Sequence, residues 1–124
     1  MVSARIGASN ADVIEVDFLV DTGTFYSFIS PALCEQIGIE LVVRRQAVAA
    51  DNRRLDVRMG IAYIEIDGRD AAIIVGGLDV PVPLLGVEAL EALGFKVNPV
   101  DQTLEQTRPF PETPILTVLP DNDP

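Results

Sequence analysis

Alternation of apolar and polar positions predicts a strand near the start of the chain. Over residues 13–20 every even-numbered position is apolar, while Glu15 and Asp17 give the opposite face a polar first half. Because no polar residue follows on that face, the strand is expected to become more buried as it runs. It therefore carries Asp21 toward the interior.

The same periodicity predicts two hairpins further along. Residues 61–75 contain two apolar runs separated by Asp67-Gly68, a dipeptide typical of a tight turn. Strands are also expected at about 40–50 and 54–66, joined by an Ala-Asp-Asn-Arg-Arg segment. Asp and Asn tolerate the positive φ that a tight turn requires, so this segment is the expected tip of a hairpin.

Helix signals occur at two places. Ser30 is a good N-cap and the following proline a good first helical residue, so residues 31–37 are expected to form a short helix closed by Gly38. A second short helix is expected over residues 87–93, ended by Gly94. Both helices are too short to make an α-helical domain, so the chain is predicted to be all-β with one or two short helices.

The two helices also belong to a faint internal repeat. Residues 35–41 and 91–97 share the scheme Glu-x-apolar-Gly-apolar-x-apolar. The proline-containing segment after Asn98 is expected to be extended, with one strand at residues 115–119.

Length and charge exclude several classes of protein. A chain of 124 residues has room for one domain with a single core. Its 19 acidic against 9 basic residues give a net charge of -10, which disfavours nucleic acid and anionic membrane surfaces as partners. No apolar run is long enough for a membrane span, and the N-terminus lacks the features of a signal peptide, so a cytoplasmic location is expected.

The chain lacks the residues of several common catalytic sites. It has no histidine, which excludes Ser-His and Cys-His catalysis and histidine-bound zinc. Cys34 is the only cysteine, so it cannot form an intrachain disulfide, and it is expected to be a small core residue of the first helix. Carboxylates remain as the groups for acid–base chemistry, and neither a metal nor an organic cofactor is expected.

One carboxylate stands out by its context. Asp21-Thr22-Gly23 follows the apolar Phe-Leu-Val end of the first strand and precedes Thr24 and an apolar run that leads into the first helix. Later in the chain Leu84-Leu85-Gly86 precedes the second helix in the same way. The tripeptide alone is weak evidence, but the order of these elements is specific.

These elements, in this order, resemble the retroviral-type aspartic proteases, and still more closely their small single-domain prokaryotic relatives. The resemblance covers residues 13–99. It implies a retropepsin-like closed β-barrel with a flap hairpin and one lobe per chain, in a domain of residues 1–99. The extended tail, residues 100–124, departs from the retroviral pattern and is a candidate part of the dimer interface.

The resemblance assigns roles to individual residues. Asp21 matches the catalytic aspartate, and Thr22 the residue whose hydroxyl locks the two Asp-bearing turns across a dimer axis. Gly23 would let the chain turn sharply and let another backbone approach. A hydroxyl at Thr24 could bond the Asp21 carboxylate and favour its ionised form, which predicts an acidic pH optimum. The Leu84-Leu85-Gly86 segment is a structural support.

Because the chain has a single Asp-Thr-Gly, the resemblance implies a two-fold symmetric homodimer whose two Asp21 side chains share one proton. The substrate would be an extended peptide or protein segment, covered by a flap with Ala50, Asp51, Asn52 and Arg53 at its tip. No glycine lies between Gly38 and Gly60, so Asn52 is the nearest substitute for the glycines of retroviral flaps.

Three readings remain open. The first is an aspartic endopeptidase that uses a water activated by Asp21 of both chains. The second is a non-proteolytic dimerisation or peptide-binding module with the same fold. The third is a barrel in which Asp21 only caps the amides of its own loop. The arginines at 53 and 54 could favour acidic substrates or could simply be solvated turn residues.

Overall fold

The computed structural model describes residues 1–112, which form nine strands and two short helices. In chain order these are β1 (Val2–Ser9), β2 (Asp12–Val20), β3 (Ser27–Ile29), α1 (Pro31–Gln36), β4 (Leu41–Val48), β5 (Arg54–Ile66), β6 (Arg69–Gly77), β7 (Leu84–Leu85), α2 (Val87–Leu93), β8 (Phe95–Asn98) and β9 (Thr103–Gln106). The predicted all-β class with two short helices is confirmed.

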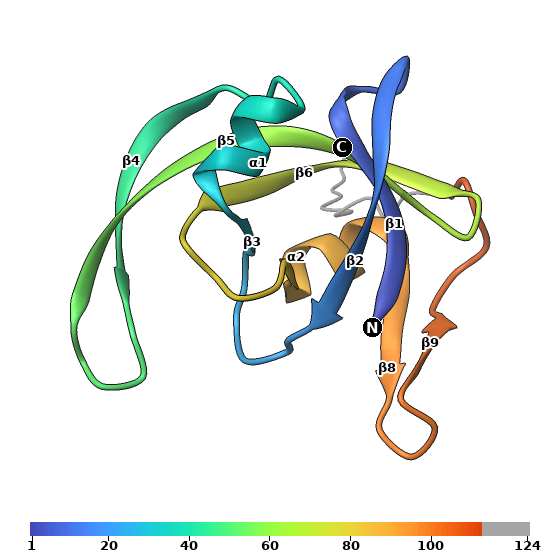
Figure 1. The fold of residues 1–124 in the computed structure, drawn as a ribbon. Coiled ribbons are helices and arrows are strands. Elements are labelled where there is room, and N and C mark those ends of the chain that lie inside the picture. Colours follow the sequence, from blue (N-terminus) through green and yellow to red (C-terminus); the bar gives the residue numbers. More distant parts are fainter. Residues whose placement is uncertain (113–124) are drawn as a thin grey trace, which may run out of the picture.

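Seven of the strands form one sheet, in the order β1-β2-β7-β3-β6-β5-β4. Strand β1 also pairs with β5, through Arg5 with Glu65, Ile6 with Ile64 and Gly7 with Tyr63, so the sheet closes on itself and leaves β4 outside the ring. Figure 1 shows this curvature, with the long β4–β5 hairpin reaching away from the ring. The predicted barrel is thus a near-ring of strands around one core.

The core lies inside this ring. Phe18, Ile6 and Ile64 are fully buried, and Leu85 and Ile29 join them from the short central strands. Cys34 is 1% exposed on the inner side of α1, as predicted, and burial raises the pKa of its thiol. An inert thiol packed as a small apolar group is consistent with these observations.

Both helices begin and end where the sequence predicts, within one residue. The Ser30 hydroxyl accepts a hydrogen bond from Leu33 N–H at 3.1 Å, and Pro31 is the first residue of α1. Gly38, after α1, has φ 78, and Gly94, after α2, has φ 77. The two halves of the faint repeat therefore share a left-handed glycine after a helix, a conformation that other residues rarely adopt.

Four strands were not predicted, namely β1, β3, β8 and β9. Strands β8 and β9 form a separate antiparallel hairpin, with Phe95 opposite Gln106 and Asn98 opposite Thr103. The predicted domain boundary after residue 99 falls in the turn of this hairpin, so residues 100–112 are hydrogen-bonded to the preceding domain. The predicted strand at 115–119 lies outside the described residues.

Two arginines complete the end of α2. The Arg69 guanidinium, 4% exposed, donates to the carbonyls of Leu93 and Gly94 at 3.2 Å each and to that of Arg108 at 2.7 Å. Arg108 donates to the carbonyls of Glu91 and Ala92. Carbonyls at the end of a helix lack hydrogen-bond donors within the helix, so the two guanidinium groups provide those donors.

Candidate active site

Asp21 is held at the end of β2 by a parallel pairing with β7. Leu19 pairs with Leu84 and Val20 with Leu85, and the Asp21 N–H donates to the Leu85 carbonyl at 3.0 Å. Because β7 lies between β2 and β3 in the sheet, the loop that carries Asp21 crosses over the end of β7. The two predicted motifs are therefore side by side.

Gly86 brings the N-terminus of α2 against the same loop. A Cβ at Gly86 would lie 2.6 Å from the carbonyl oxygen of Phe25 and closer still to that of Tyr26, so only glycine fits. Its N–H donates to the hydroxyl of Ser27 at 3.0 Å, and Ser27 is completely buried.

Two backbone hydrogen bonds tie the loop to α2. Val87 N–H donates to the Thr24 carbonyl at 3.0 Å, and Glu88 N–H donates to the Phe25 carbonyl at 2.8 Å. Together with the Ser27 bond, these contacts hold residues 24–27 against the start of α2. Ser27 was not singled out from the sequence, where a lone serine in an apolar run carries no distinctive signal.

The Asp21 carboxylate is half-buried, less than a buried strand end predicts. Its Oδ1 accepts a hydrogen bond from Gly23 N–H at 2.9 Å, while Thr22 and Gly23 are exposed. Gly23 lies in the turn that Thr24 N–H closes on the Asp21 carbonyl, and its φ is not positive. A Cβ at Gly23 would lie 3.1 Å from Asp21 Oδ1, so glycine instead leaves room beside the carboxylate.

The predicted hydrogen bond from Thr24 to Asp21 is absent. The Thr24 hydroxyl donates to the Tyr26 carbonyl at 3.1 Å instead. The cause is the turn itself, which Thr24 N–H closes by donating to the Asp21 main-chain carbonyl at 3.3 Å, leaving the Thr24 hydroxyl to bond the loop downstream. The acidic optimum that we derived from this bond therefore loses its basis.

The predicted β4–β5 hairpin is present, with a tight turn at its tip. Ala49 N–H donates to the Arg53 carbonyl at 2.8 Å, and Asn52 has φ 66, the conformation for which it was expected to replace glycine. Asp51 forms an ion pair with Arg53, with Nε 2.7 Å from Oδ2. Ala50 and these three charged or polar residues are all exposed at the tip. Figure 1 shows the tip and the Asp21 loop on the same side of the molecule, below the ring.

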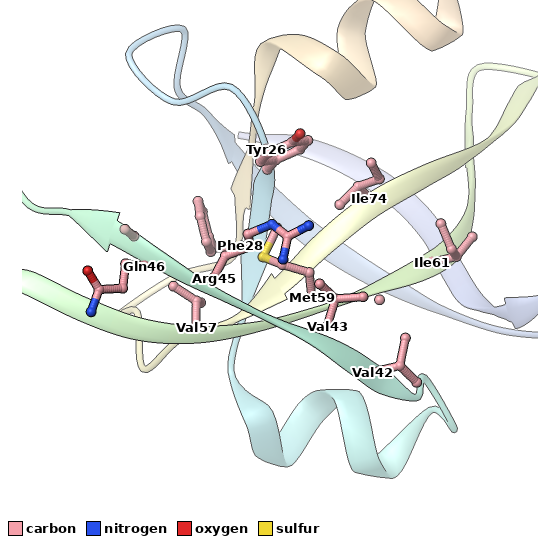
Figure 2. A pocket seen from close by; sticks show the side chains of 12 residues that line it. Tyr26, Phe28, Val42, Val43, Arg45, Gln46, Val57, Met59, Ile61 and Ile74 are labelled. Atoms are coloured by element: carbon pink, nitrogen blue, oxygen red, sulfur yellow. The ribbon is translucent and has the colours of Figure 1, made fainter.

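A groove of about 520 Å³ lies beneath this hairpin. Its walls come from β3, β4, β5 and β6, and most of the lining side chains are apolar (Figure 2). Tyr26 and Phe28, which follow Asp21 in the chain, also line the groove, although Asp21 itself does not.

A second hollow, of about 500 Å³, lies on the other side of the Asp21 loop. Thr22 lines it together with Val87 and Leu90 of α2 and Phe95 and Val97 of β8. Exposed apolar side chains flank the same loop, since Leu19 is 45% and Phe25 54% exposed. This surface around Asp21 is therefore largely apolar.

Glu88 is the acidic residue in the first turn of α2 and lies near this loop. Burial raises the pKa of its carboxyl, the hydrogen bond from Ile74 N–H at 3.2 Å lowers it, and the like charge of Glu91 raises it further. The net shift is upward. The Glu88 side chain thus links α2 to β6 by a hydrogen bond, and its ionised carboxylate is partly desolvated there.

Among residues 1–112 the structure brings together no group of three or more side chains that could ligate a metal. None of the helices in this described part has the length and apolar character needed to cross a membrane.

No model of a known protein family matches the chain, and no curated protein matches it. Among solved structures it is similar to EIAV protease complexed with the inhibitor HBY-793, with a TM-score of 0.59 and 20% sequence identity over 77% of this chain and 88% of that chain. The closer likeness to prokaryotic relatives stays a prediction. Sequence identity this low bears on the fold alone, and the fold it shows is that of a retroviral, retropepsin-like protease.

Proposed function

We propose that the protein is a homodimeric aspartic endopeptidase that hydrolyses peptide bonds with Asp21 of both chains. The observation that carries the proposal is the Asp21-Thr22-Gly23 loop, fastened to Leu85 and Gly86 inside a retropepsin-like fold. The similar solved structure is named a protease, which supports the same activity here.

The surface around Asp21 supports the dimer. The sequence holds a single Asp-Thr-Gly, so a second catalytic carboxylate has to come from a second chain. Thr22 and Gly23 are exposed and stand between the exposed side chains of Leu19 and Phe25. A second copy docked on this apolar surface would bury it and bring the two Asp21 side chains together.

Two carboxylates held about 3 Å apart repel each other by about 5 kcal/mol at an effective dielectric of 20, so the pair keeps one proton. The ionised Asp21 takes a proton from a water between the carboxyls, and the water oxygen bonds the scissile carbonyl carbon. The protonated Asp21 gives its proton to the carbonyl oxygen. In the second step the Asp21 that took the water proton gives it to the amide nitrogen, the other Asp21 takes a proton from a hydroxyl of the tetrahedral intermediate, and the C–N bond breaks, so the pair again holds one proton.

The β4–β5 hairpin is the proposed flap. Its tip lies on the same side of the molecule as the Asp21 loop, and the left-handed Asn52 gives the tight turn that retroviral flaps build with glycine (Figure 1). Closing this hairpin over an extended peptide would exclude water from the carboxyl pair. The peptide would add its main chain to the surrounding strands by hydrogen bonds.

The test is cleavage of a peptide library by the wild type and by Asp21→Asn, with and without an aspartic protease inhibitor of the pepstatin kind. We expect cleavage by the wild type alone, with specific activity that falls on dilution as dimers dissociate. Asp21→Asn should still form dimers in sedimentation experiments. A variant that retains cleavage, or wild-type activity per chain that is constant at every concentration, would contradict the shared site.

The second candidate is a peptide-binding or dimerisation module with the same fold. It is favoured by one observation, the absence of glycine from the hairpin tip, where the Asp51–Arg53 ion pair stiffens the turn. A wild-type protein that binds library peptides at all pH values tested and cleaves none of them would establish this candidate.

A further inference from the structure

The register of β4 with β5 separates the hairpin into two faces. Arg45 lies opposite Val57 and Ala47 opposite Leu55, so these side chains share one face. Arg44 lies opposite Arg58, and both point to the other face. Arg45, Ala47 and Val57 line the groove, and so does Gln46 of the other face, whereas Arg44 and Arg58 do not. The groove-facing side of the hairpin therefore carries a different set of residues from its outer side.

Arg45 is the one charged residue among those that line the groove. Figure 2 shows the Arg45 side chain among the labelled residues that line the groove. One of its N–H groups donates to the Arg44 carbonyl at 2.8 Å. A guanidinium has five N–H donors, so most of those of Arg45 remain for a ligand.

No carboxylate within residues 1–112 lies within ion-pair distance of Arg45. This is unexpected in a chain with 19 acidic residues and a net charge of -10. Basic residues are concentrated in the hairpin, which holds five of the nine in the chain: Arg44, Arg45, Arg53, Arg54 and Arg58. The hairpin is thus a positive segment on an acidic protein, and the exposed side chain of one of its cations, Arg45, lines a largely apolar groove.

We propose that this groove selects peptide substrates with an acidic side chain, and that Arg45 is the residue that binds the carboxylate. The proposal rests on the proposed endopeptidase function. In an extended peptide every second side chain points the same way, about 7 Å apart. A carboxylate on Arg45 therefore places the side chain two residues away against Phe28, Val57 and Met59, which favours a large apolar residue. The preferred segment is Asp or Glu, any residue, then Leu, Ile, Phe or Met, in either chain direction.

A guanidinium and a carboxylate that meet within apolar walls form charge-assisted hydrogen bonds stronger than those of an exposed pair. The test uses sets of peptides that are cleaved by the wild type and differ only in Glu, Gln or Lys at the position next but one to an apolar residue. We expect kcat/KM for the Glu peptide to exceed that for the Gln peptide by about fivefold or more, and the Lys peptide to be the poorest. Arg45→Gln should abolish the difference, and Arg45→Glu should reverse it in favour of Lys.

Arg58→Glu is the matched control, because it makes the same charge change on the outer face of the same hairpin. It should leave the ratio of Glu to Gln peptides as in the wild type, even if both rates change. A ratio that shifts equally in Arg58→Glu and Arg45→Glu would overturn the proposal in favour of a general charge effect of the hairpin.

The remaining outcomes separate this inference from the proposed function. Cleavage without any preference among Glu, Gln and Lys peptides overturns the inference and leaves the endopeptidase intact. If no peptide is cleaved, the same peptides are measured for binding by fluorescence anisotropy. Binding of Glu peptides that depends on Arg45 then supports acidic recognition without proteolysis. Self-association that depends on Arg45, with no peptide binding, assigns the groove to a second copy of the chain and overturns the proposal.

Discussion

Gly86 illustrates how a single atom sets the geometry of the Asp21 loop. Its backbone lies against the carbonyls of Phe25 and Tyr26, which are main-chain atoms and cannot rotate away as a side chain could. A methyl group at this position must therefore push the loop and α2 apart. The need for glycine at position 86 arises from contact between segments distant in sequence, so it could not be predicted from neighbouring residues. The Asp21 motif, in contrast, could be recognised from adjacent residues alone.

We expect Gly86→Ala to lower the free energy of unfolding by about 1–3 kcal/mol, as overpacked sites do, and to reduce peptide cleavage. Urea denaturation followed by fluorescence or circular dichroism would measure the first effect. Gly68→Asn is the control, because Gly68 has φ 79 with no atom within 4 Å of an added Cβ, and asparagine tolerates that conformation. If Gly86→Ala has the same free energy of unfolding as the wild type, the Asp21 loop can move enough to accommodate the added methyl group.

Glu88 gives a pH-dependent prediction. Because burial raises its pKa in the folded state above the usual 4.5, protonation favours folding. The contribution of this group to stability is fully present below the unfolded pKa and is lost as pH rises through the folded pKa. Glu88→Gln retains an oxygen that can accept the Ile74 N–H but carries no charge, so it avoids that loss.

The variant Glu88→Gln should therefore gain stability relative to the wild type as pH increases from about 4 to about 7. Denaturant titrations of both proteins across this range would measure the difference. Glu35→Gln, on the exposed side of α1, serves as the control and should show no such trend. A stability difference between Glu88→Gln and the wild type that is the same at every pH would refute the coupling to Glu88.

At the scale of elements, the helices and strands that could be predicted are those whose signals lie within the segment itself. The β5–β6 hairpin has clear alternation on both sides of Asp67-Gly68, and each helix has a glycine with positive φ immediately after it or one residue beyond. Strand β3 has only three residues and pairs with β6 and β7, so its conformation depends on partners rather than on its own pattern. The same holds for β8 and β9, which pair only with each other.

Arg69 shows why part of the fold could not be predicted. In the sequence it directly follows the Asp67-Gly68 turn, and no role was predicted for it. In the structure it is buried, forms no ion pair with a carboxylate within residues 1–112, and instead donates to three carbonyls around the end of α2. Its guanidinium also lies 5.3 Å from the centre of the Phe95 ring. Only the meeting of β6, α2 and the segment after β9 creates this site.

We expect Arg69→Lys to lower the free energy of unfolding by about 2–3 kcal/mol, because an ammonium group cannot reach all three carbonyls and leaves buried acceptors without donors. Thermal and urea unfolding would measure the loss. Arg58→Lys makes the same exchange on the exposed outer face of β5 and should change stability little. Equal effects of the two substitutions would mean that the hydrogen bonds of Arg69 contribute nothing net.

For the whole molecule, ring closure and dimerisation lie beyond what a local pattern can encode. Closure depends on β1 pairing with β5 through residues some sixty positions apart, and β1 itself was not predicted. The prediction of a closed barrel came from the resemblance carried by Asp21-Thr22-Gly23 and Leu84-Leu85-Gly86. The charge distribution is likewise a property of the folded molecule, because only the pairing of β4 with β5 shows that Arg45 and Arg58 have opposite surroundings.

The requirement for two Asp21 side chains can be tested by mixing chains. When wild-type and Asp21→Asn subunits exchange freely, only wild-type pairs hold both carboxylates. At equal amounts and constant total concentration, activity should fall to roughly a quarter of the wild-type value, whereas chains that act alone would retain roughly half. Mixing with Asp17→Asn, altered at an exposed carboxylate of β2, should cause no loss. Differently tagged chains would report whether exchange is complete, and a loss in direct proportion to the variant would exclude a site built from two chains.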